Sequence, residues 1–456
     1  IIPDFILEMT DKECEFESHE RDNKIIIDGC FCSKKRITVP DKINGKHVTG
    51  ISCGAFRHLT DLKRISIPDG ITTIGESAFA QCESLKSVDL PENLEDINYG
   101  VFYDCINLSS ISIPEGVTEI GESAFYGCKN LTSVDLPEKL QAVRDRAFAY
   151  CEKITGMSLP SRLKSIGRSA FEGCKSLSSI KIPNSIETIE PFFLEGSGVT
   201  SVSIQPGIQT IWEKAFYSCP ELVSVSIPET VTRIEFGAFK GCHKLKNITN
   251  TAGLVDIGVG AFEDCGFSSF TIPDKVRVID VGVFASCSQL EQVVMHNGIR
   301  SIRDSAFAEC VKLRKIIIPD SVENIGRSAF QGSGLISVSV PSKVKTIEFK
   351  VFSDCSELEN VQMRNGLERI DERAFEKCEK LKTLIIPDSV SSIEDSAFKD
   401  CSSLEQVVIP DGVKRISGNA FAGCPHLTIC GSRGSYAQKF AKQFKFPFEP
   451  SSNFTK

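Results

Sequence analysis

The sequence lacks several features that would place it in a familiar functional class. Its 456 residues include one tryptophan, four methionines and six scattered histidines, and no apolar run approaches the ~18 residues that a membrane span needs. Lys and Arg total 52 against 60 Asp and Glu, a net charge of −8, which argues against a nucleic-acid-binding protein because such proteins present a basic face. Motifs such as Gly-x-Ser-x-Gly, His-Glu-x-x-His and the phosphate-binding loop are missing. The sequence therefore predicts a protein that is not an enzyme and does not span a membrane.

Two residue types are abundant, with 30 phenylalanines and 19 cysteines. An Ala-Phe or Val-Phe pair recurs 17 times at steps of 22 or 23 residues if Leu194 is counted in place of phenylalanine. The repeat position holds Phe56, Phe79, Phe102, Phe125, Phe148, Phe171, Leu194, Phe216, Phe239, Phe262, Phe284, Phe307, Phe330, Phe352, Phe375, Phe398 and Phe421. Units of this size cannot bury a core alone but can do so when stacked. The repeat therefore predicts a single solenoid.

One unit shows how each turn is expected to fold. Apolar residues alternate in 62–67, which predicts a short strand with one buried face. Pro68 ends the strand because proline cannot donate to a ladder. Residues 71–74 then start the return leg, and Ala78 and Phe79 anchor the far side. Stacked units would pair their strands in parallel at ~4.8 Å.

The ends of the chain depart from the repeat and are predicted to cap the solenoid. We expect residues 1–36 to form an N-terminal cap, residues 37–430 the solenoid, and residues 431–456 a C-terminal helical cap and tail. Ser435 is placed to cap a helix whose apolar residues share one face. The tail from Pro447 is expected to be loosely held.

The unit pattern resembles the leucine-rich repeat of the BspA type. The segment Ile-Thr-Thr-Ile-Gly-Glu-Ser-Ala-Phe-Ala-Gln-Cys at 71–82 is close to that family's consensus, and the segments at 39–49 and 434–440 are similar to its edges. The resemblance covers roughly residues 37 to 448. It implies a leucine-rich-repeat superhelix with parallel strands on the concave face, short turns or helical segments elsewhere, and no cofactor.

The same resemblance implies a function. Members of this family are similar to secreted or surface-attached bacterial adhesins, so we expect a monomeric, non-catalytic protein, extracellular or at the cell surface. It would bind host or microbial proteins or glycans through its concave face. The alternative is a structural spacer that presents other domains and has no ligand. The printed chain starts at Ile1 without a signal peptide, so export is expected from the resemblance alone.

Fourteen cysteines share one repeat position, which Ser197 and Ser333 interrupt. They are Cys82, Cys105, Cys128, Cys151, Cys174, Cys219, Cys242, Cys265, Cys287, Cys310, Cys355, Cys378, Cys401 and Cys424. A disulfide ladder is one interpretation, but equivalent Cβ atoms ~4.8 Å apart exceed the usual ~3.8 Å. Serine also suits a small buried position. We therefore predict reduced, buried thiols.

Cys14, Cys30 and Cys32 lie outside the repeat, with His19 nearby. A disulfide that staples the N-terminal cap is one interpretation. A zinc site is another, although Cys-x-Cys matches common zinc spacing poorly. Otherwise these cysteines belong to the core of the cap. We assign no metal site from the sequence.

The candidate ligand contacts are outward positions of the later strands. There the exposed columns change from mostly serine and aspartate to larger, more apolar groups: Gln292, Val294, Lys315, Ile317, Ile385, Gln406 and Val408. Exposed apolar clusters often mark interaction sites. The competing interpretation is that β-branched residues simply suit strands.

Two further features stand apart from these columns. Trp212 occupies a repeat position otherwise held by residues such as Gly75 and Arg144, so it is either a contact anchor or packs over a neighbouring turn. Shortened turns occur at Gly198, Gly266 and Gly334, each 68 residues from the next. We expect glycine there because it accepts an unusual backbone conformation.

Overall fold

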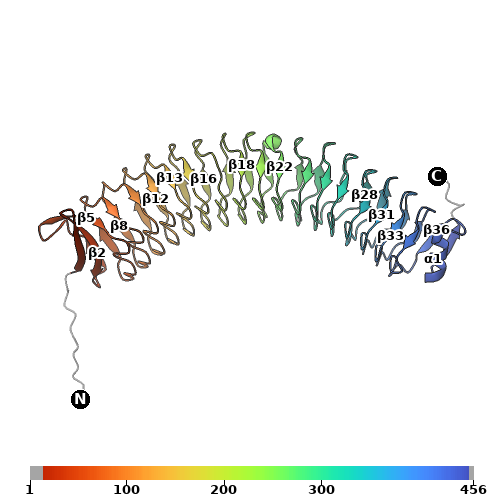
Figure 1. Ribbon diagram of the computed structural model, residues 1–456, viewed down its shortest axis with the longest axis horizontal. Helices are drawn as coiled ribbons and strands as arrows, with labels where there is room; N and C mark the ends of the chain where they lie inside the picture. The colour runs from red at the N-terminus through yellow and green to blue at the C-terminus, as the bar shows by residue number, and fades with distance from the viewer. Residues whose placement is uncertain (1–13, 451–456) are drawn as a thin grey trace, which may run out of the picture. The chain divides into compact units, whose positions relative to one another are not determined.

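The computed structural model describes residues 14–450 (Figure 1). The chain divides into two compact units, 1–208 and 209–456. In each unit short parallel strands succeed one another turn by turn, and a single short α-helix, α1, lies at the C-terminal end of the described residues. The predicted fold class, a parallel-strand solenoid with a C-terminal helix, is confirmed.

In the first unit, the predicted strand of each turn is three residues long, and the strands pair in parallel within short sheets of two or three strands, as in Ile65↔Val88 and Ile111↔Val134. These strands are β3 (Arg36–Thr38), β6 (Arg64–Ser66), β8 (Ser87–Asp89), β10 (Ser110–Ser112), β12 (Ser133–Asp135), β14 (Gly156–Ser158), β16 (Ser179–Lys181) and β17 (Ser201–Ser203). The return leg carries a second series that was not predicted. It comprises β7 (Thr73–Ile74), β9 (Asp96–Ile97), β11 (Glu119–Ile120), β13 (Ala142–Val143) and β15 (Ser165–Ile166).

The second unit repeats both series. Its first series comprises β19 (Ser224–Ser226), β21 (Asn247–Thr249), β23 (Ser269–Thr271), β25 (Gln292–Val294), β28 (Ser337–Val340), β30 (Asn360–Met363), β32 (Thr383–Ile385), β34 (Gln406–Val408) and β36 (Thr428–Gly431). The return-leg series comprises β18 (Thr210–Ile211), β20 (Arg233–Ile234), β22 (Asp256–Ile257), β24 (Val278–Ile279), β26 (Ser301–Ile302), β27 (Asn324–Ile325), β29 (Thr346–Ile347), β31 (Arg369–Ile370), β33 (Ser392–Ile393) and β35 (Arg415–Ile416). A 3-10 turn, η1 (Thr251–Gly253), replaces one proline turn.

The strand expected at 315–317 is reduced to a single parallel bridge between Lys315 and Ser337. The inward residues there are still buried, since Ile316 and Ile318 are 5% and 7% exposed. The predicted apolar alternation is therefore present, but the backbone does not complete a ladder at this turn.

The side of each turn that carries the Ala-Phe pair is tied to the next turn without forming a strand. Ser77, Phe79 and Gln81 donate their backbone N–H groups to the carbonyls of Tyr99, Val101 and Tyr103 in the next turn, at 2.7–2.9 Å. Ser77 and Gln81 have φ of 55° and 61°, in the left-handed region that costs energy for residues other than glycine. Because left-handed residues alternate with residues of ordinary backbone conformation, every second N–H points toward the neighbouring turn. The buried N–H groups thereby find hydrogen-bond acceptors.

Phenylalanine rings form the centre of each unit's core. Neighbouring rings stack face to face, with centroids 5.2 Å apart for Phe56 and Phe79 and 5.3 Å apart for Phe398 and Phe421. At the end of the first unit Phe193 lies edge-on to Phe171, at 85°, and Leu194 is fully buried. The one replacement of the anchor phenylalanine, at Leu194, therefore coincides with a change in ring packing.

The N-terminal segment forms a hairpin. β1 (Glu15–Arg21) and β2 (Lys24–Phe31) pair antiparallel through a turn at Asp22 and Asn23, both of which have positive φ, as a two-residue hairpin turn requires. β2 then pairs in parallel with β5 (Lys46–Ile51), which is also joined by β4 (Lys42–Ile43). The hairpin therefore extends the return-leg ladder and covers its first turn.

The C-terminal end is closed by α1 (Tyr436–Phe444), with Ser435 at its N-cap as predicted. Phe440 is buried and meets Phe421 edge-on at 6.1 Å. The expectation that the tail from Pro447 is loosely held is wrong for β37 (Phe448–Pro450), which pairs in parallel with β36. Residues 451–456 lie outside the described residues.

The shortened turns need glycine for a reason other than the one expected. Gly198, Gly266 and Gly334 do not have positive φ. Instead, a Cβ atom at Gly334 would lie 2.1 Å from the carbonyl oxygen of Val311 in the preceding turn, and the other two glycines meet carbonyls at 2.0 and 2.2 Å. Close approach of two backbones, and not an unusual dihedral angle, excludes a side chain here.

Candidate functional site

The outward side chains of β25, β28, β30, β32 and β34, with Lys315 and Ile317, form a surface that we call the strand face. Its apolar groups are exposed: Ile317 is 71% exposed, Ile385 69% and Val294 47%. The alternate residues Val293 and Leu384 point inward and are buried. Such exposure of large aliphatic groups has no role in the core and suits contact with a partner.

A hollow of about 790 Å³ lies on the strand face between Ile317 and Ile385. The intervening turns carry Ser339 and Gln362 in the same column. Two large aliphatic side chains therefore stand on either side of two polar ones. The lining comprises Lys315, Ile316, Ile317, Ile318, Ser337, Val338, Ser339, Asn360, Val361, Gln362, Met363, Arg364, Asn365, Thr383, Ile385, Ile386, Pro387 and Asp388. Apolar shoulders with a few polar groups are typical of ligand sites.

Charged groups stand along one edge of this hollow. Arg364 occupies the position that Pro319, Pro341 and Pro387 hold in other turns, and its Nη1 donates to Asp320 Oδ1 at 2.7 Å, two turns away. Both side chains are largely exposed, so this ion pair adds little to folding. It fixes the direction of the guanidinium group beside the hollow.

A second hollow, of about 650 Å³, adjoins the first. Its lining comprises Ser268, Ser269, Glu291, Gln292, Val293, Val294, Met295, Lys315 and Ile317. Lys315 and Ile317 therefore line both hollows. The structure thus brings together five of the candidates from the sequence, namely Gln292, Val294, Lys315, Ile317 and Ile385.

Other candidates lie beside or away from the hollows. Gln406 and Val408 are on β34, paired with Thr383 and Ile385, and are half-buried. The polar lining was not predicted from the sequence, above all Asn360, Gln362, Arg364 and Asp388. The available signal was the loss of the turn proline at His296 and Arg364, positions 68 residues apart.

Trp212 is not part of the strand face. It follows β18 on the return leg and is 37% exposed. The next three turns carry exposed apolar residues in the adjacent repeat position, Phe236, Val259 and Val281. Backbone hydrogen bonds from Gly237 to Val259 and from Gly260 to Val281 place these turns in succession. The exposed tryptophan therefore begins an apolar row on the return-leg side, which we call the return-leg row.

A serine, an aspartate and a histidine meet on the N-terminal hairpin, but not in a catalytic order. Ser52 Oγ donates to Asp28 Oδ1 at 2.6 Å, and His19 Nδ1 lies 2.7 Å from Asp28 Oδ2. Burial raises the pKa of Asp28, but the hydrogen bonds from Ser52 and His19 outweigh it and lower the pKa below its usual range. The serine proton is directed at the carboxylate and not at the imidazole, so this arrangement does not activate a nucleophile.

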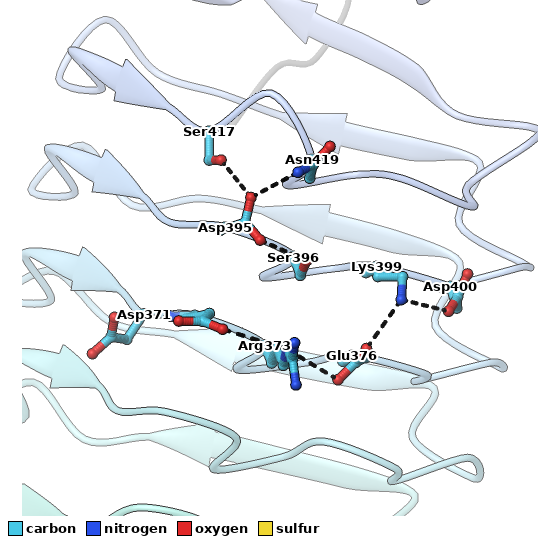
Figure 2. Close-up of polar contacts among 10 residues, drawn as sticks. Asp371, Arg373, Glu376, Asp395, Ser396, Lys399, Asp400, Ser417 and Asn419 are labelled. Atoms are coloured by element: carbon cyan, nitrogen blue, oxygen red, sulfur yellow. Dashed lines mark hydrogen bonds and ion pairs between the residues drawn. The ribbon is translucent and has the colours of Figure 1, made fainter.

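Polar contacts between successive turns cover part of the return-leg side of the second unit (Figure 2). Asp395 accepts from Ser396 Oγ and Ser417 Oγ, both at 2.9 Å, and from Asn419 Nδ2 at 3.0 Å. These hydrogen bonds, with Ser396 the largest cause, lower the pKa of Asp395. The carboxylate is fully engaged in linking two turns.

The neighbouring basic groups in Figure 2 are paired in the same way. Lys399 Nζ lies 3.5 Å from Glu376 Oε1 and 3.7 Å from Asp400 Oδ2, and Arg373 Nε lies 3.8 Å from Glu376 Oε2. Because Glu376 is only 8% exposed, these cations balance a nearly buried charge. The cluster therefore has a structural explanation that needs no ligand.

The repeated cysteines are free thiols, as predicted. In turn after turn, as at Cys82 and Cys424, the thiol donates Sγ–H to the carbonyl oxygen of the phenylalanine at the anchor position of the preceding turn, at 3.0–3.2 Å. Burial raises the pKa of Cys82 and of Cys355 to about 12. These thiols are therefore part of the core and poor nucleophiles, since the thiolate is the reactive form.

A sequence model of the BspA type leucine rich repeat region matches residues 24–155, 95–223, 209–336 and 323–433. Together these matches span most of the chain, and the model itself describes six copies of the repeat. The chain belongs to this family of leucine-rich-repeat proteins. No curated protein matches the chain, and no helix in residues 14–450 is long and apolar enough to cross a membrane.

Solved structures similar to this one include bacterial leucine-rich-repeat proteins. One from Bacteroides ovatus is 24% identical, with a TM-score of 0.55, and the alignment covers 97% of this chain and 99% of that one. A leucine rich cell surface protein from Faecalibacterium prausnitzii is 25% identical with a TM-score of 0.39, covering 78% and 94%. The first similarity supports the fold.

Proposed function

We propose that this protein is a non-catalytic binding protein whose strand face holds a protein ligand. The observation that carries the proposal is the pair of exposed isoleucines, Ile317 and Ile385, on the two sides of a hollow of about 790 Å³. Exposed aliphatic groups around a recess supply the anchor pockets on which protein interfaces depend. Lys315, Arg364 and Asp388 on the same surface would give the interface its orientation and specificity.

The finer parts of the proposal follow from the family. BspA-type repeats are typical of proteins at bacterial surfaces, so we propose an extracellular or cell-surface location and a role as an adhesin for host or microbial proteins or glycans. The chain would act as a monomer. A protein ligand is favoured over a glycan because the hollow combines aliphatic shoulders with both signs of charge.

The second candidate function is a structural spacer. The regular packing of the turns within each unit and the hydrogen bonds between turns would suit a spacer that presents other domains. A spacer gives no reason for isoleucine at two positions that are 71% and 69% exposed, since serine occupies the same repeat position at Ser226 and Ser339.

The two functions are separated by a binding experiment on the reduced full chain. Collagen, fibronectin and laminin would be immobilised and binding followed by biolayer interferometry. If the chain is a binding protein, we expect saturable binding to at least one of them. Binding should be weakened about tenfold or more in Ile317→Ser/Ile385→Ser, since each anchor that a partner covers contributes about 1–2 kcal/mol.

The matched control removes exposed apolar groups elsewhere in the same unit. Phe236→Ser/Val259→Ser changes the return-leg row and leaves the strand face intact, so it should bind as the unmodified chain does. Saturable binding that both double variants retain would contradict the strand face as the site. No saturable binding to any of the three proteins would favour the spacer.

A further inference from the structure

The three cysteines outside the repeat converge at the open end of the N-terminal hairpin. The sulfur atoms of Cys14, Cys30 and Cys32 all lie within 4.8 Å of one another. The register of β1 and β2 explains this, because Glu15 pairs with Phe31 and Phe16 with Cys30. Cys14 thus comes opposite Cys32, and Cys30 and Cys32 share one side of the chain.

From this convergence we infer that Cys14, Cys30 and Cys32 form a binding site for a divalent thiophilic cation, Zn²⁺. Three thiolates around zinc at ~2.3 Å stand about 3.8 Å apart, so sulfur atoms within 4.8 Å need to move by less than about 1 Å. Cys30 is buried while Cys14 and Cys32 are half-buried. The ion would be shielded on one side and open to a water ligand on the other.

The chemistry of binding is simple to balance. Each thiol releases its proton to solvent and forms one sulfur–zinc bond in place of a water of the hydrated ion, and no electrons are transferred. Three thiolates and Zn²⁺ leave one net negative charge, which the positive charge of the nearby Lys34 partly offsets.

Other uses of this cluster fit less well. A disulfide would engage two sulfurs and leave the third without a role, and the three thiols are free. Burial in the cap core does not require that three sulfurs approach one another. A metal ion uses all three and joins the residue before β1 to the residues at the end of β2, which fixes the hairpin whose Phe16 packs on Phe56 at 6.5 Å.

The test uses the full chain, reduced and stripped of metal with a chelator. After incubation with zinc sulfate and desalting, we expect about one zinc ion per chain by mass spectrometry of the metal, and none in Cys14→Ser/Cys32→Ser. The matched control is Cys53→Ser, because Cys53 is an exposed free thiol outside the cluster, and it should bind zinc normally. Thermal unfolding should shift upward with zinc in the unmodified chain and in the control only.

A second probe covers the case in which the double variant does not fold. Cobalt(II) added to the unmodified reduced chain should give a thiolate-to-cobalt charge-transfer absorption, which zinc then abolishes by displacement. A reduced chain that retains no zinc, a cobalt spectrum without that absorption, or a folded double variant that retains as much zinc as the unmodified chain would each overturn the site.

Discussion

The thiol of Cys378 donates a hydrogen bond to the backbone carbonyl oxygen of Phe352, 3.2 Å away in the preceding turn. This hydrogen bond joins the two repeat positions that account for the many phenylalanines and cysteines of the sequence. The phenylalanine ring stacks on its neighbours, and the cysteine of the next turn satisfies the backbone of the same residue. The cysteine position therefore suits a small side chain with a donor, and the serine that stands there at Ser333 is buried, with its hydroxyl 3.3 Å from the Cys355 thiol.

Cys378→Ala should lower the stability of the reduced chain by about 1–2 kcal/mol, because it removes a buried hydrogen bond and leaves a small void. Cys378→Ser keeps a donor and should cost less. Urea unfolding of the two variants, followed by circular dichroism, measures the difference. Equal losses would show that the hydrogen bond contributes nothing beyond volume.

The pH dependence of stability follows from the raised thiol pKa values. Cys82, Cys174 and Cys287 have pKa values of about 12 in the fold against 9.0 for the free thiol, with burial as the main cause. A pKa that is raised on folding gives stability that is complete below pH 9 and is lost as the pH rises from 9 to 12, since only the unfolded chain ionises.

Each such thiol should reduce the free energy of unfolding by about 1.4 kcal/mol per pH unit within that window. Thermal unfolding of the reduced chain between pH 8 and 10.5 measures the slope. The slope should be smaller in Cys82→Ser, which removes one of these thiols. An identical slope in the two proteins would contradict burial of the thiol.

Gly334→Ala should destabilise the second unit by at least about 2 kcal/mol, because the new Cβ would meet the Val311 carbonyl oxygen at 2.1 Å. Gly156→Ala is the matched control, since a Cβ there has nothing within 4 Å, and it should change stability by less than about 0.5 kcal/mol. Differential scanning calorimetry compares them. Comparable melting temperatures for the two variants would refute the close approach.

Ser435→Ala should loosen the C-terminal cap by about 1 kcal/mol, because the serine side chain accepts from the backbone N–H of Gln438 at the start of α1. Ser435→Thr retains the hydroxyl and serves as the control. Amide hydrogen exchange at Phe440 should accelerate in the alanine variant alone. Exchange that is unchanged in both would mean that packing of Phe440 on Phe421, and not the cap, holds the helix.

The repeat predicts which residues share a column but not how the columns approach one another. The strand at 64–66, the phenylalanine stack and the buried thiols were predicted because apolar side chains must recur at each turn. The return-leg strands and the left-handed residues such as Ser77 were not, because backbone pairing between turns leaves no side-chain pattern. The tail strand at Phe448–Pro450 was missed for the same reason.

The candidate site was predicted in part. An exposed Ile317 was visible as a departure from serine in an outward column. The hollow beside Ile317 could not be predicted in the same way. It forms where the small side chain of Ser339 lies among larger side chains of neighbouring turns, and that arrangement is visible only in the structure. The convergence of Cys14 with Cys32 required the hairpin register, which the spacing of cysteines along the chain does not specify.

The most direct test of the proposed function is a substitution that fills the hollow and leaves Ile317 and Ile385 in place. Ser339→Arg puts a long side chain on the floor, and Ser226→Arg makes the same change at the same repeat position on β19, outside the hollow. Affinity for whichever of collagen, fibronectin or laminin the unmodified chain binds would be measured by biolayer interferometry. The account predicts a Kd at least about tenfold higher for Ser339→Arg and an unchanged Kd for Ser226→Arg; equal Kd values for both variants would contradict it.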